Sequence, residues 1–483
     1  MSRLKKELGL LDATMIGIGG TIGPGAFIIV GRSAGMIGPP VIIAWLSVGI
    51  VTLLCALNYS ELASALPIAG GGYTFTKKAV GELPAFTTGW FMWLANCVYA
   101  SFCAIGFAYL LRLVLQFGEG IVPFIATLTV AIFTMINYVG AKQAGRAQTL
   151  VTIILFVVIG LILSLGVFFT ISNPEVLGRP FTLPSPSGFF RVVGYIWVTM
   201  MGFQIVATAS EEIKNAERNV PLAMVITVLI STIIYTLIGF FSVYSKLPYE
   251  TLAGSTVPLA DMAGQYLGEF GIILVSLGGM VATLSSLNVA IMAAARVAYA
   301  MSRDDYLPDS FGKVHHHFGS PFVALAASSG IILAFCGSGV IDYVVYMSNF
   351  CYLVGMLIII YSVIRLRNQE PDLARPFKVP WFPLSSLLAI GALLVILPFI
   401  EESALATGSG LIITAVIAYY GVMIGYERIR YALGGMDLLI GCLFIGASLL
   451  LPLGTTFRIY LAFFATVFSL AGVVYVTTTR ERG

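Results

Sequence analysis

The chain has 483 residues, of which 58% are hydrophobic and only 10% are charged, and its formal net charge is +3. Soluble proteins of this size carry charge on roughly a quarter of their residues. The composition therefore excludes a soluble globular protein and predicts an all-α polytopic membrane protein, surrounded by membrane lipid and without a nucleic-acid partner.

Apolar runs long enough to cross a bilayer follow one another along the whole chain. With about 20 residues for each span, we expect about 14 transmembrane helices. The polar segments between them are too short for a soluble domain, so the function is expected to lie in the membrane. The expected spans lie near residues 10–36, 39–66, 85–114, 121–140, 148–171, 190–210, 221–245, 269–301, 321–338, 340–364, 381–400, 405–425, 436–453 and 457–477.

Lysine and arginine are unevenly distributed between the expected loops. If the N-terminus is cytoplasmic, about 20 of the 26 Lys and Arg lie on the cytoplasmic side. This bias predicts a multi-pass protein of the cell membrane with both termini in the cytoplasm. No small-residue cleavage site precedes the first span, so we expect no removable signal peptide. All six cysteines lie in apolar runs, where packing is expected rather than disulfides.

The first expected span contains the sequence GIGGTIGPGAF, residues 17–27. Glycine and proline weaken helices, and irregular backbone at membrane depth is tolerated only inside protein or beside a wet cavity. A half-helix beginning near Gly25 would direct free N–H groups at a carboxylate. The carbonyls from Ile18 to Thr21 suit an ammonium group or a sodium ion. Together these ends fit an amino acid, whereas the alternative is that the glycines serve close helix packing.

A second weak point lies in the sixth expected span, where Thr199 and Gly202 precede a charged loop. Breaks in the first and the sixth span are what two inverted repeats of five helices would produce. Such repeats place the binding site between the two breaks, near the middle of the membrane. The sequence therefore predicts a substrate site formed by both.

Few ionisable residues lie inside the expected spans. Glu61 is in the cytoplasmic half of the second span and Arg296 is toward the cytoplasmic end of the eighth. We expect them to form a cytoplasmic gate, although they could also lie at helix ends and set topology. Glu61 is in addition the one candidate proton carrier. No acid lies near the middle of the membrane, which favours neutral amino acids over lysine or arginine as cargo, because a buried cation would lack a counter-charge.

Other motifs give little support for different functions. The three histidines at 315–317 have no adjoining cysteines or acids, so we expect a solvated loop rather than a metal site. Asn96 and Tyr99 in the third span could line a pocket for a substrate side chain or could simply pack. The sequence has no nucleotide-binding loop and no hydrolase or metalloprotease motif. We therefore expect no enzyme, no cofactor and no metal.

Five motifs together resemble the amino acid–polyamine–organocation family of permeases, close to its cationic-amino-acid-transporter-like branch. The resemblance covers nearly the whole chain and implies the LeuT-type fold. Helices 1–5 and 6–10 would form inverted repeats within residues 1–368, and residues 369–483 would form accessory helices 11–14. The motifs are IGIGGTIGPGAF at 16–27, YSELASALPIAGGGY at 59–73, GAKQAGRAQ at 140–148, EEIKNAERNVP at 211–221 and RVAYAMSRDDYLP at 296–308.

The resemblance implies particular contacts with an amino acid. Backbone amides near Gly23 and Gly25, after Ile22, would hold the carboxylate, and carbonyls near Thr21 would meet the ammonium group. Pro24 departs from the family pattern, because it has no N–H to donate. On the sixth helix, the carbonyls from Val198 to Met201 would complete the ammonium site, and Trp197 or Val198 would lie near an aromatic gate.

The resemblance leaves the coupling ion open. Proton-coupled relatives have a lysine in the fifth helix where this sequence has Leu155. Sodium could bind between carbonyls near Ile16 and Gly19 and the hydroxyls of Ser285 and Ser286, because oxygen ligands suit a hard cation. The serines could equally bond back to their own helix. Exchange and facilitated diffusion also remain open.

The sequence thus predicts a secondary active transporter of amino acids, with neutral ones expected, working by alternating access. The first alternative is a transporter or exchanger of the same fold for cationic amino acids, polyamines or amines. A channel or a membrane enzyme is the second, but neither repeated pore segments nor clusters of catalytic residues are visible. The preferred side chain, the direction of flux and the oligomeric state do not follow from the sequence.

Overall fold

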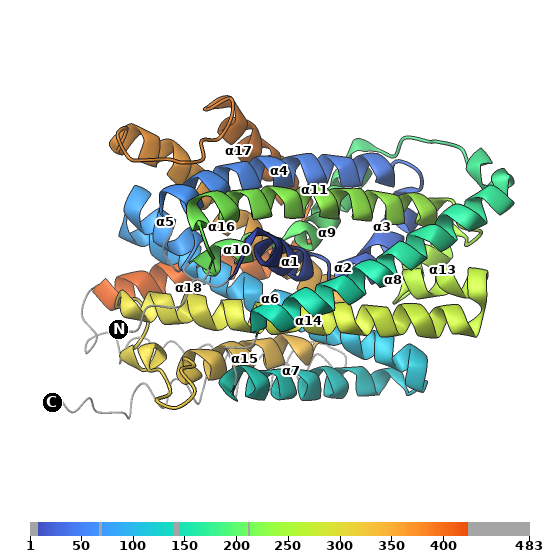
Figure 1. Cartoon of the computed structure of the whole chain (residues 1–483), viewed down its shortest axis with the longest axis horizontal. Helices are drawn as coiled ribbons and strands as arrows, with labels where there is room; N and C mark the ends of the chain where they lie inside the picture. The colour runs from blue at the N-terminus through green and yellow to red at the C-terminus, as the bar shows by residue number, and fades with distance from the viewer. Residues whose placement is uncertain (1–7, 67–69, 140–143, 211–212, 424–483) are drawn as a thin grey trace.

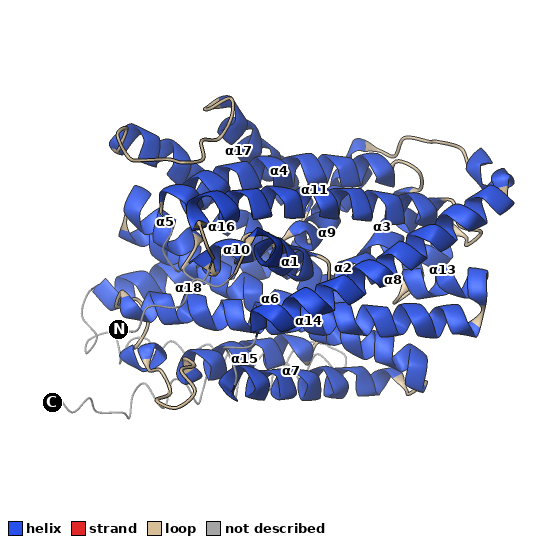
Figure 2. Cartoon of the chain, in the orientation of Figure 1, coloured by secondary structure: helices blue, strands red, loops and turns tan. Residues whose placement is uncertain are grey.

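The computed structural model describes residues 8–66, 70–139, 144–210 and 213–423. These residues form helices and connecting loops, with one isolated bridge between Leu8 and Ile213 (Figure 2). The long helices run roughly along the longest axis of the molecule, with α5 (Gly72–Ala79) at the left and α13 (Pro258–Leu267) at the right (Figure 1). The expected all-α fold is confirmed. The expected spans near 436–453 and 457–477 lie outside the described residues.

The first ten expected spans correspond to ten helical segments, of which the first and the sixth are broken. The first consists of α1 (Leu10–Thr21), α2 (Pro24–Phe27) and α3 (Ile29–Ile37), and the sixth of α9 (Pro186–Ile196), the 3-10 turn η4 (Trp197–Met200) and α10 (Ile205–Thr208). The other eight are α4 (Val41–Ala65), α6 (Glu82–Leu115), α7 (Val122–Val139), α8 (Ala144–Ser172), α11 (Ala216–Val243), α14 (Glu269–Arg303), α15 (Phe322–Cys336) and α16 (Ile341–Gln369).

Several elements were not expected as separate units. The short helix α5 follows α4, and α12 (Tyr249–Gly254) and α13 lie between α11 and α14. Short 3-10 turns are η1 (Glu119–Ile121), η3 (Pro174–Gly178), η6 (Asp309–Gly312) and η7 (Leu397–Phe399). After α16 the chain forms α17 (Leu384–Ile396) and α18 (Glu402–Met423).

Length and composition show which helices can cross a membrane. Eight segments of the described chain are long and apolar enough, or nine if α17 and α18, which bend by 117° at their junction, are one span. The sequence predicted two separate spans there, at 381–400 and 405–425. The first span is missing from the eight because its break divides it, and α15 is apolar but only 15 residues long.

Three of the spans pack on the span five places later. Helix α4 packs on α11, α6 on α14 and α7 on α15, which are the pairs 2–7, 3–8 and 4–9. The contact of α1 with α8, the pair 1–5, has a counterpart in the contact of α9 with α16, the pair 6–10. Two inverted repeats of five helices would produce these pairings.

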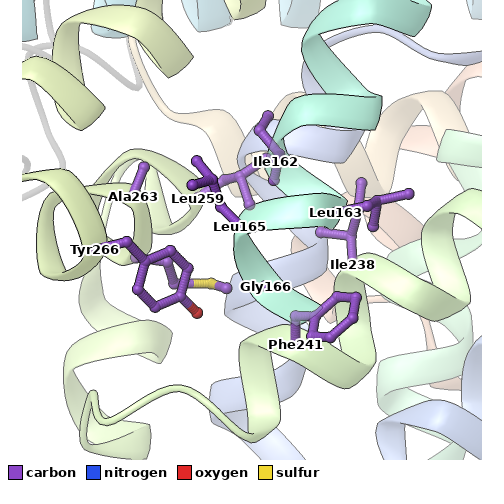
Figure 3. A pocket seen from close by; sticks show the side chains of 10 residues that line it. Ile162, Leu163, Leu165, Gly166, Ile238, Phe241, Leu259, Ala263 and Tyr266 are labelled. Atoms are coloured by element: carbon purple, nitrogen blue, oxygen red, sulfur yellow. The ribbon is translucent and has the colours of Figure 1, made fainter. Parts of the chain in front are cut away.

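The outer helices α7 and α8 present apolar side chains away from the bundle. Phe124, Met135, Val157 and Phe168 are between 62% and 71% exposed, which is typical of helices that face lipid. Between α8, α11 and α13 lies a small apolar pocket of about 10 Å³, lined mainly by aliphatic and aromatic side chains (Figure 3). Its apolar lining offers little to a zwitterion.

Candidate substrate site

The break in the first span has a clear local cause. Helix α1 ends at Thr21, and α2 begins at Pro24, which occupies the first turn where its missing N–H costs nothing. Ile22 and Gly23 between them are not helical, and both are buried. In Figure 1 the labels of α1, α2 and α10 lie together near the centre of the bundle. The predicted break is therefore present at the predicted residues.

The backbone conformation at the break in the sixth span requires a glycine at position 202. The residue has a φ of +138°, a conformation that side chains with a Cβ rarely adopt. A Cβ added to Gly202 would lie 2.5 Å from the carbonyl carbon of Gly20 and 2.5 Å from the backbone nitrogen of Thr21. Gln204 braces the turn, because its Oε1 accepts a hydrogen bond of 2.9 Å from the Gly202 N–H. No motif in the sequence marks Gln204 for this role.

The two breaks meet at one tyrosine. The hydroxyl of Tyr235 on α11 lies 2.8 Å from the carbonyl oxygen of Thr21 and 3.2 Å from that of Thr199. Close packing accompanies this contact, because a Cβ on Gly25 would lie 2.5 Å from Cγ2 of Thr199. Tyr235 is fully buried. The structure thus brings together carbonyls of both breaks, and it adds a hydroxyl donor that no motif in the sequence marked.

Further hydroxyl groups surround the first break. Tyr99 on α6 donates to the carbonyl oxygen of Gly20 at 3.2 Å, and Ser286 on α14 donates to that of Gly19 at 2.9 Å. A Cβ on Gly23 would lie 2.5 Å from Oγ of Ser286 and 3.1 Å from the Tyr99 hydroxyl. Ser286 therefore bonds across to α1 instead of back to its own helix.

The other expected residues lie nearby with less specific contacts. Ile16, one turn before Gly19 on α1, packs with Ile205 and Val289, and Ser285 is 8% exposed on α14. Ile18, Ile22, Trp197, Val198 and Met201 are all buried in the core around the two breaks. Leu155, the position at which the resemblance implies a lysine in proton-coupled relatives, is also buried.

Glu61 has other partners than the expected Arg296. Its carboxylate accepts two hydrogen bonds from Arg367, at 2.7 and 2.6 Å, and a third of 2.7 Å from the Val379 N–H. Arg375 Nε lies 3.4 Å from the same carboxylate. Arg367 lies near the end of α16, which packs beside α4, and Arg375 lies in the segment that follows α16. Arg296 lies on α14, two turns before its end.

A second charged cluster lies at the opposite end of α16. Arg32 on α3 donates to Asp342 Oδ1 at 2.8 Å and, through Nε, to the carbonyl oxygen of Ser255 at 2.7 Å. The Tyr195 hydroxyl on α9 donates to the same Asp342 oxygen at 2.8 Å. The cluster joins two helices to the start of α16. These are α3, the last helix of the broken first span, and α9, the first helix of the broken sixth span. Its members lie far apart along the chain, so no local motif marks the cluster.

Replacing Asp342 by asparagine tests how much this cluster stabilises the bundle. The Asp342 side chain is 50% exposed, so we expect the change to cost only about 0.2–1 kcal/mol of stability, the effect of a partly solvated ion pair. The thermal unfolding temperature of the purified variant in detergent measures this. Glu401→Gln, an exposed acid before α18, is the control and should leave the unfolding temperature unchanged. A loss of several kcal/mol in Asp342→Asn would contradict this interpretation of the cluster.

A bundle of membrane-spanning helices with two interrupted helices meeting at its centre is the architecture of a membrane transporter. Comparison with known proteins makes the class specific: the family described as amino acid permease matches residues 8–423. The chain belongs to this amino acid permease family, and it is a transporter rather than an enzyme.

Individual relatives agree with this assignment. The branched-chain amino acid permease BcaP of Bacillus subtilis (strain 168) is 31% identical over 80% of this chain and 86% of its own length. The serine/threonine exchanger SteT of the same organism is 28% identical over 87% of this chain and 97% of its own. The human cystine/glutamate transporter is 26% identical over 89% and 87%. The resemblance to the permease superfamily and the expected amino acid transport are confirmed.

Proposed function

We propose that the protein is a secondary active carrier of neutral amino acids that binds its substrate where the two helix breaks meet. One observation carries the proposal: a single buried hydroxyl, that of Tyr235, reaches the carbonyl oxygens of both Thr21 and Thr199. Carbonyls at the ends of two half-helices carry partial negative charge and lack partners within their helices. A substrate ammonium group would find two acceptors at this point.

The substrate carboxylate would bind at the start of the second half-helix. The N–H groups of Gly23 and Gly25 are the candidate donors, and Pro24 between them has none. The hydroxyls of Tyr99 and Ser286, which lie close to Gly23, are additional donors that offset the missing amide. This arrangement supports a site for the zwitterionic part of an amino acid.

The charges of the bundle favour a neutral side chain. Among the described residues with fully buried side chains, Glu61 is the one acid, and Arg367 and Arg375 already bind it. A buried cationic side chain would therefore have no counter-charge. Two of the relatives are named for neutral amino acids, the branched-chain permease and the serine/threonine exchanger, which supports the same class.

Alternating access would use the two charged clusters at the ends of α16. We place the Glu61 cluster at the cytoplasmic end of a carrier in the cell membrane, with both termini in the cytoplasm, because most Lys and Arg then lie inside. The Asp342 cluster would close the outer end. Residues 1–368 would form the transport core, and residues 369–483 the accessory helices. Arg296 and Trp197 remain candidate gate residues in this scheme.

Uptake into liposomes that hold the purified protein tests the proposal. Labelled alanine, leucine and arginine are offered under separate sodium and proton gradients, and with or without amino acid inside. We expect saturable uptake of a neutral amino acid. Transport of arginine alone would contradict the charge argument. Uptake that depends only on internal amino acid would identify an exchanger.

Sodium coupling is a separate prediction that rests on Ser286. Its hydroxyl meets the Gly19 carbonyl at 2.9 Å, and two such oxygens can contribute to a site for a hard cation. We expect Ser286→Ala to remove the stimulation of uptake by a sodium gradient. Ser164→Ala, which changes a solvent- or lipid-exposed serine of α8, should keep it. If Ser286→Ala retains full stimulation, sodium does not bind at this position.

A further inference from the structure

A small cavity lies beside the break in the sixth span, where Gln204 and Ile205 line it. Its volume is about 20 Å³, and it lies between α4, α6, α14 and the short helices α5 and α10. The residues that matter for its chemistry are Tyr59, Asn96 and Gln204. All three side chains are almost completely buried, so any polar atom without a partner there carries a desolvation cost.

Gln204 places an unpaired hydrogen-bond donor at this cavity. Its Oε1 accepts from the Gly202 N–H, and this contact fixes which end of the amide is oxygen. The Nε2 atom at the other end is buried and has no hydrogen-bond partner among the described residues. Gln204 is 2% exposed. A buried amide donor of this kind matches a ligand that brings an acceptor oxygen.

The neighbouring polar side chains already have hydrogen-bond partners. Asn96 Oδ1 accepts from the Tyr352 hydroxyl at 3.2 Å, and the Tyr59 hydroxyl accepts from the Gly72 N–H at 2.7 Å. The hydroxyls of Tyr73 and Thr208 in the lining donate to other groups and present acceptor oxygens. A ligand hydroxyl, which both accepts and donates, fits this lining better than a methyl group does, because a methyl group would leave the Gln204 donor unpaired.

Two residues of the cavity lining lie beside residues that contact the first break. Gln204 holds Gly202, which touches the backbone of Gly20 and Thr21. Asn96 lies one helical turn from Tyr99 on α6, and Tyr99 donates to the carbonyl oxygen of Gly20. About 20 Å³ is room for a water molecule or a hydroxyl group. A short substrate side chain would have to extend from the breaks into this cavity to contact Gln204.

We propose that Gln204 selects substrates whose short side chain carries a hydroxyl group, so that the carrier prefers threonine and serine to valine and alanine. The inference rests on the proposed function, since it takes the backbone of the amino acid to be bound at the two breaks. Gln204 would be a specificity residue that contacts the substrate side chain, while its oxygen holds the Gly202 turn.

Threonine and valine provide the sharpest test, because they have nearly the same shape and differ in a hydroxyl against a methyl group. Each unlabelled amino acid competes for uptake of labelled threonine into liposomes holding the full chain. We expect the wild type to favour threonine over valine by about tenfold, the effect of one buried hydrogen bond and the donor left unpaired without it. Gln204→Leu and Gln204→Met should bring the ratio close to one.

The ratio of competition by threonine to competition by valine distinguishes a loss of substrate specificity from a general structural effect. If the substitutions only disturbed the Gly202 turn, competition by threonine and competition by valine would weaken equally. Their ratio would then stay unchanged, and that result would overturn the proposal. Gln265→Leu, the same change at an exposed position of α13, is the matched control and should keep the wild-type ratio. A wild type that prefers valine would also overturn the proposal while leaving amino acid transport intact. Absence of any amino acid uptake by the wild type would instead contradict the proposed function.

Discussion

Gly202→Ala is expected to abolish transport. The added Cβ would lie 2.5 Å from backbone atoms of Gly20 and Thr21, and backbone in a packed core cannot move aside as the end of a flexible side chain can. Alanine also tolerates the φ of +138° poorly. Because the contact joins the two breaks, the substitution would separate the carbonyls that we assign to the ammonium group. Initial uptake rates, with size-exclusion chromatography to follow folding, measure the effect.

Gly160→Ala is the matched control for this substitution. Gly160 lies on the exposed side of α8, where an added Cβ meets nothing within 4 Å. Alanine there should be neutral or stabilise the helix by about 0.5–1 kcal/mol. Normal uptake by Gly202→Ala would show that the two breaks do not need this close contact, and our account of the site would be wrong.

Glu61→Gln is expected to have the largest effect on stability. The carboxylate is 1% exposed and binds two arginines, of which the Arg375 side chain is 5% exposed. Removing one partner of a buried ion pair leaves the other charge uncompensated, at a cost of about 3–5 kcal/mol. We expect a clear fall in the thermal unfolding temperature of the detergent-solubilised protein, with slower uptake by whatever fraction folds.

Two further variants show whether the charge is responsible. Glu217→Gln changes an exposed acid in the first turn of α11 and should leave the unfolding temperature unchanged. Combining Glu61→Gln with Arg375→Gln should cost less than the sum of the single changes, since the second change removes a stranded cation. Strict additivity would mean that Glu61 and Arg375 do not interact.

The sequence predicted the position of the first break because proline and glycine act locally. Pro24 and Gly23 determine where a helix can begin, whatever surrounds them. The second break had a weaker local signal, a single glycine, and only its correspondence with the first made it credible. Its cause is partly distant: Gly202 is needed because the backbone of Gly20 lies against it.

Partners that meet through tertiary packing could not be read from the sequence. Glu61 and Arg367 are separated by 306 positions and Arg32 and Asp342 by 310, so a search for charges inside spans suggested Arg296 as the partner instead. The role of Tyr235 could not be predicted either, because the sequence does not show whether a tyrosine in an apolar span packs or donates a hydrogen bond. Its role becomes visible only from its hydrogen bonds to the two breaks.

The most direct test of the central claim is competition by substrate analogues. The two breaks should bind both ends of the zwitterion. The ammonium group should lie at the carbonyls of Thr21 and Thr199, and the carboxylate beside Gly23 and Gly25. A transported neutral amino acid is compared with its N-acetyl derivative and its α-amide as competitors for uptake of the labelled parent into liposomes. We expect neither derivative to compete at a concentration where the parent abolishes labelled uptake. Competition by either derivative as strong as that by the parent would contradict the account.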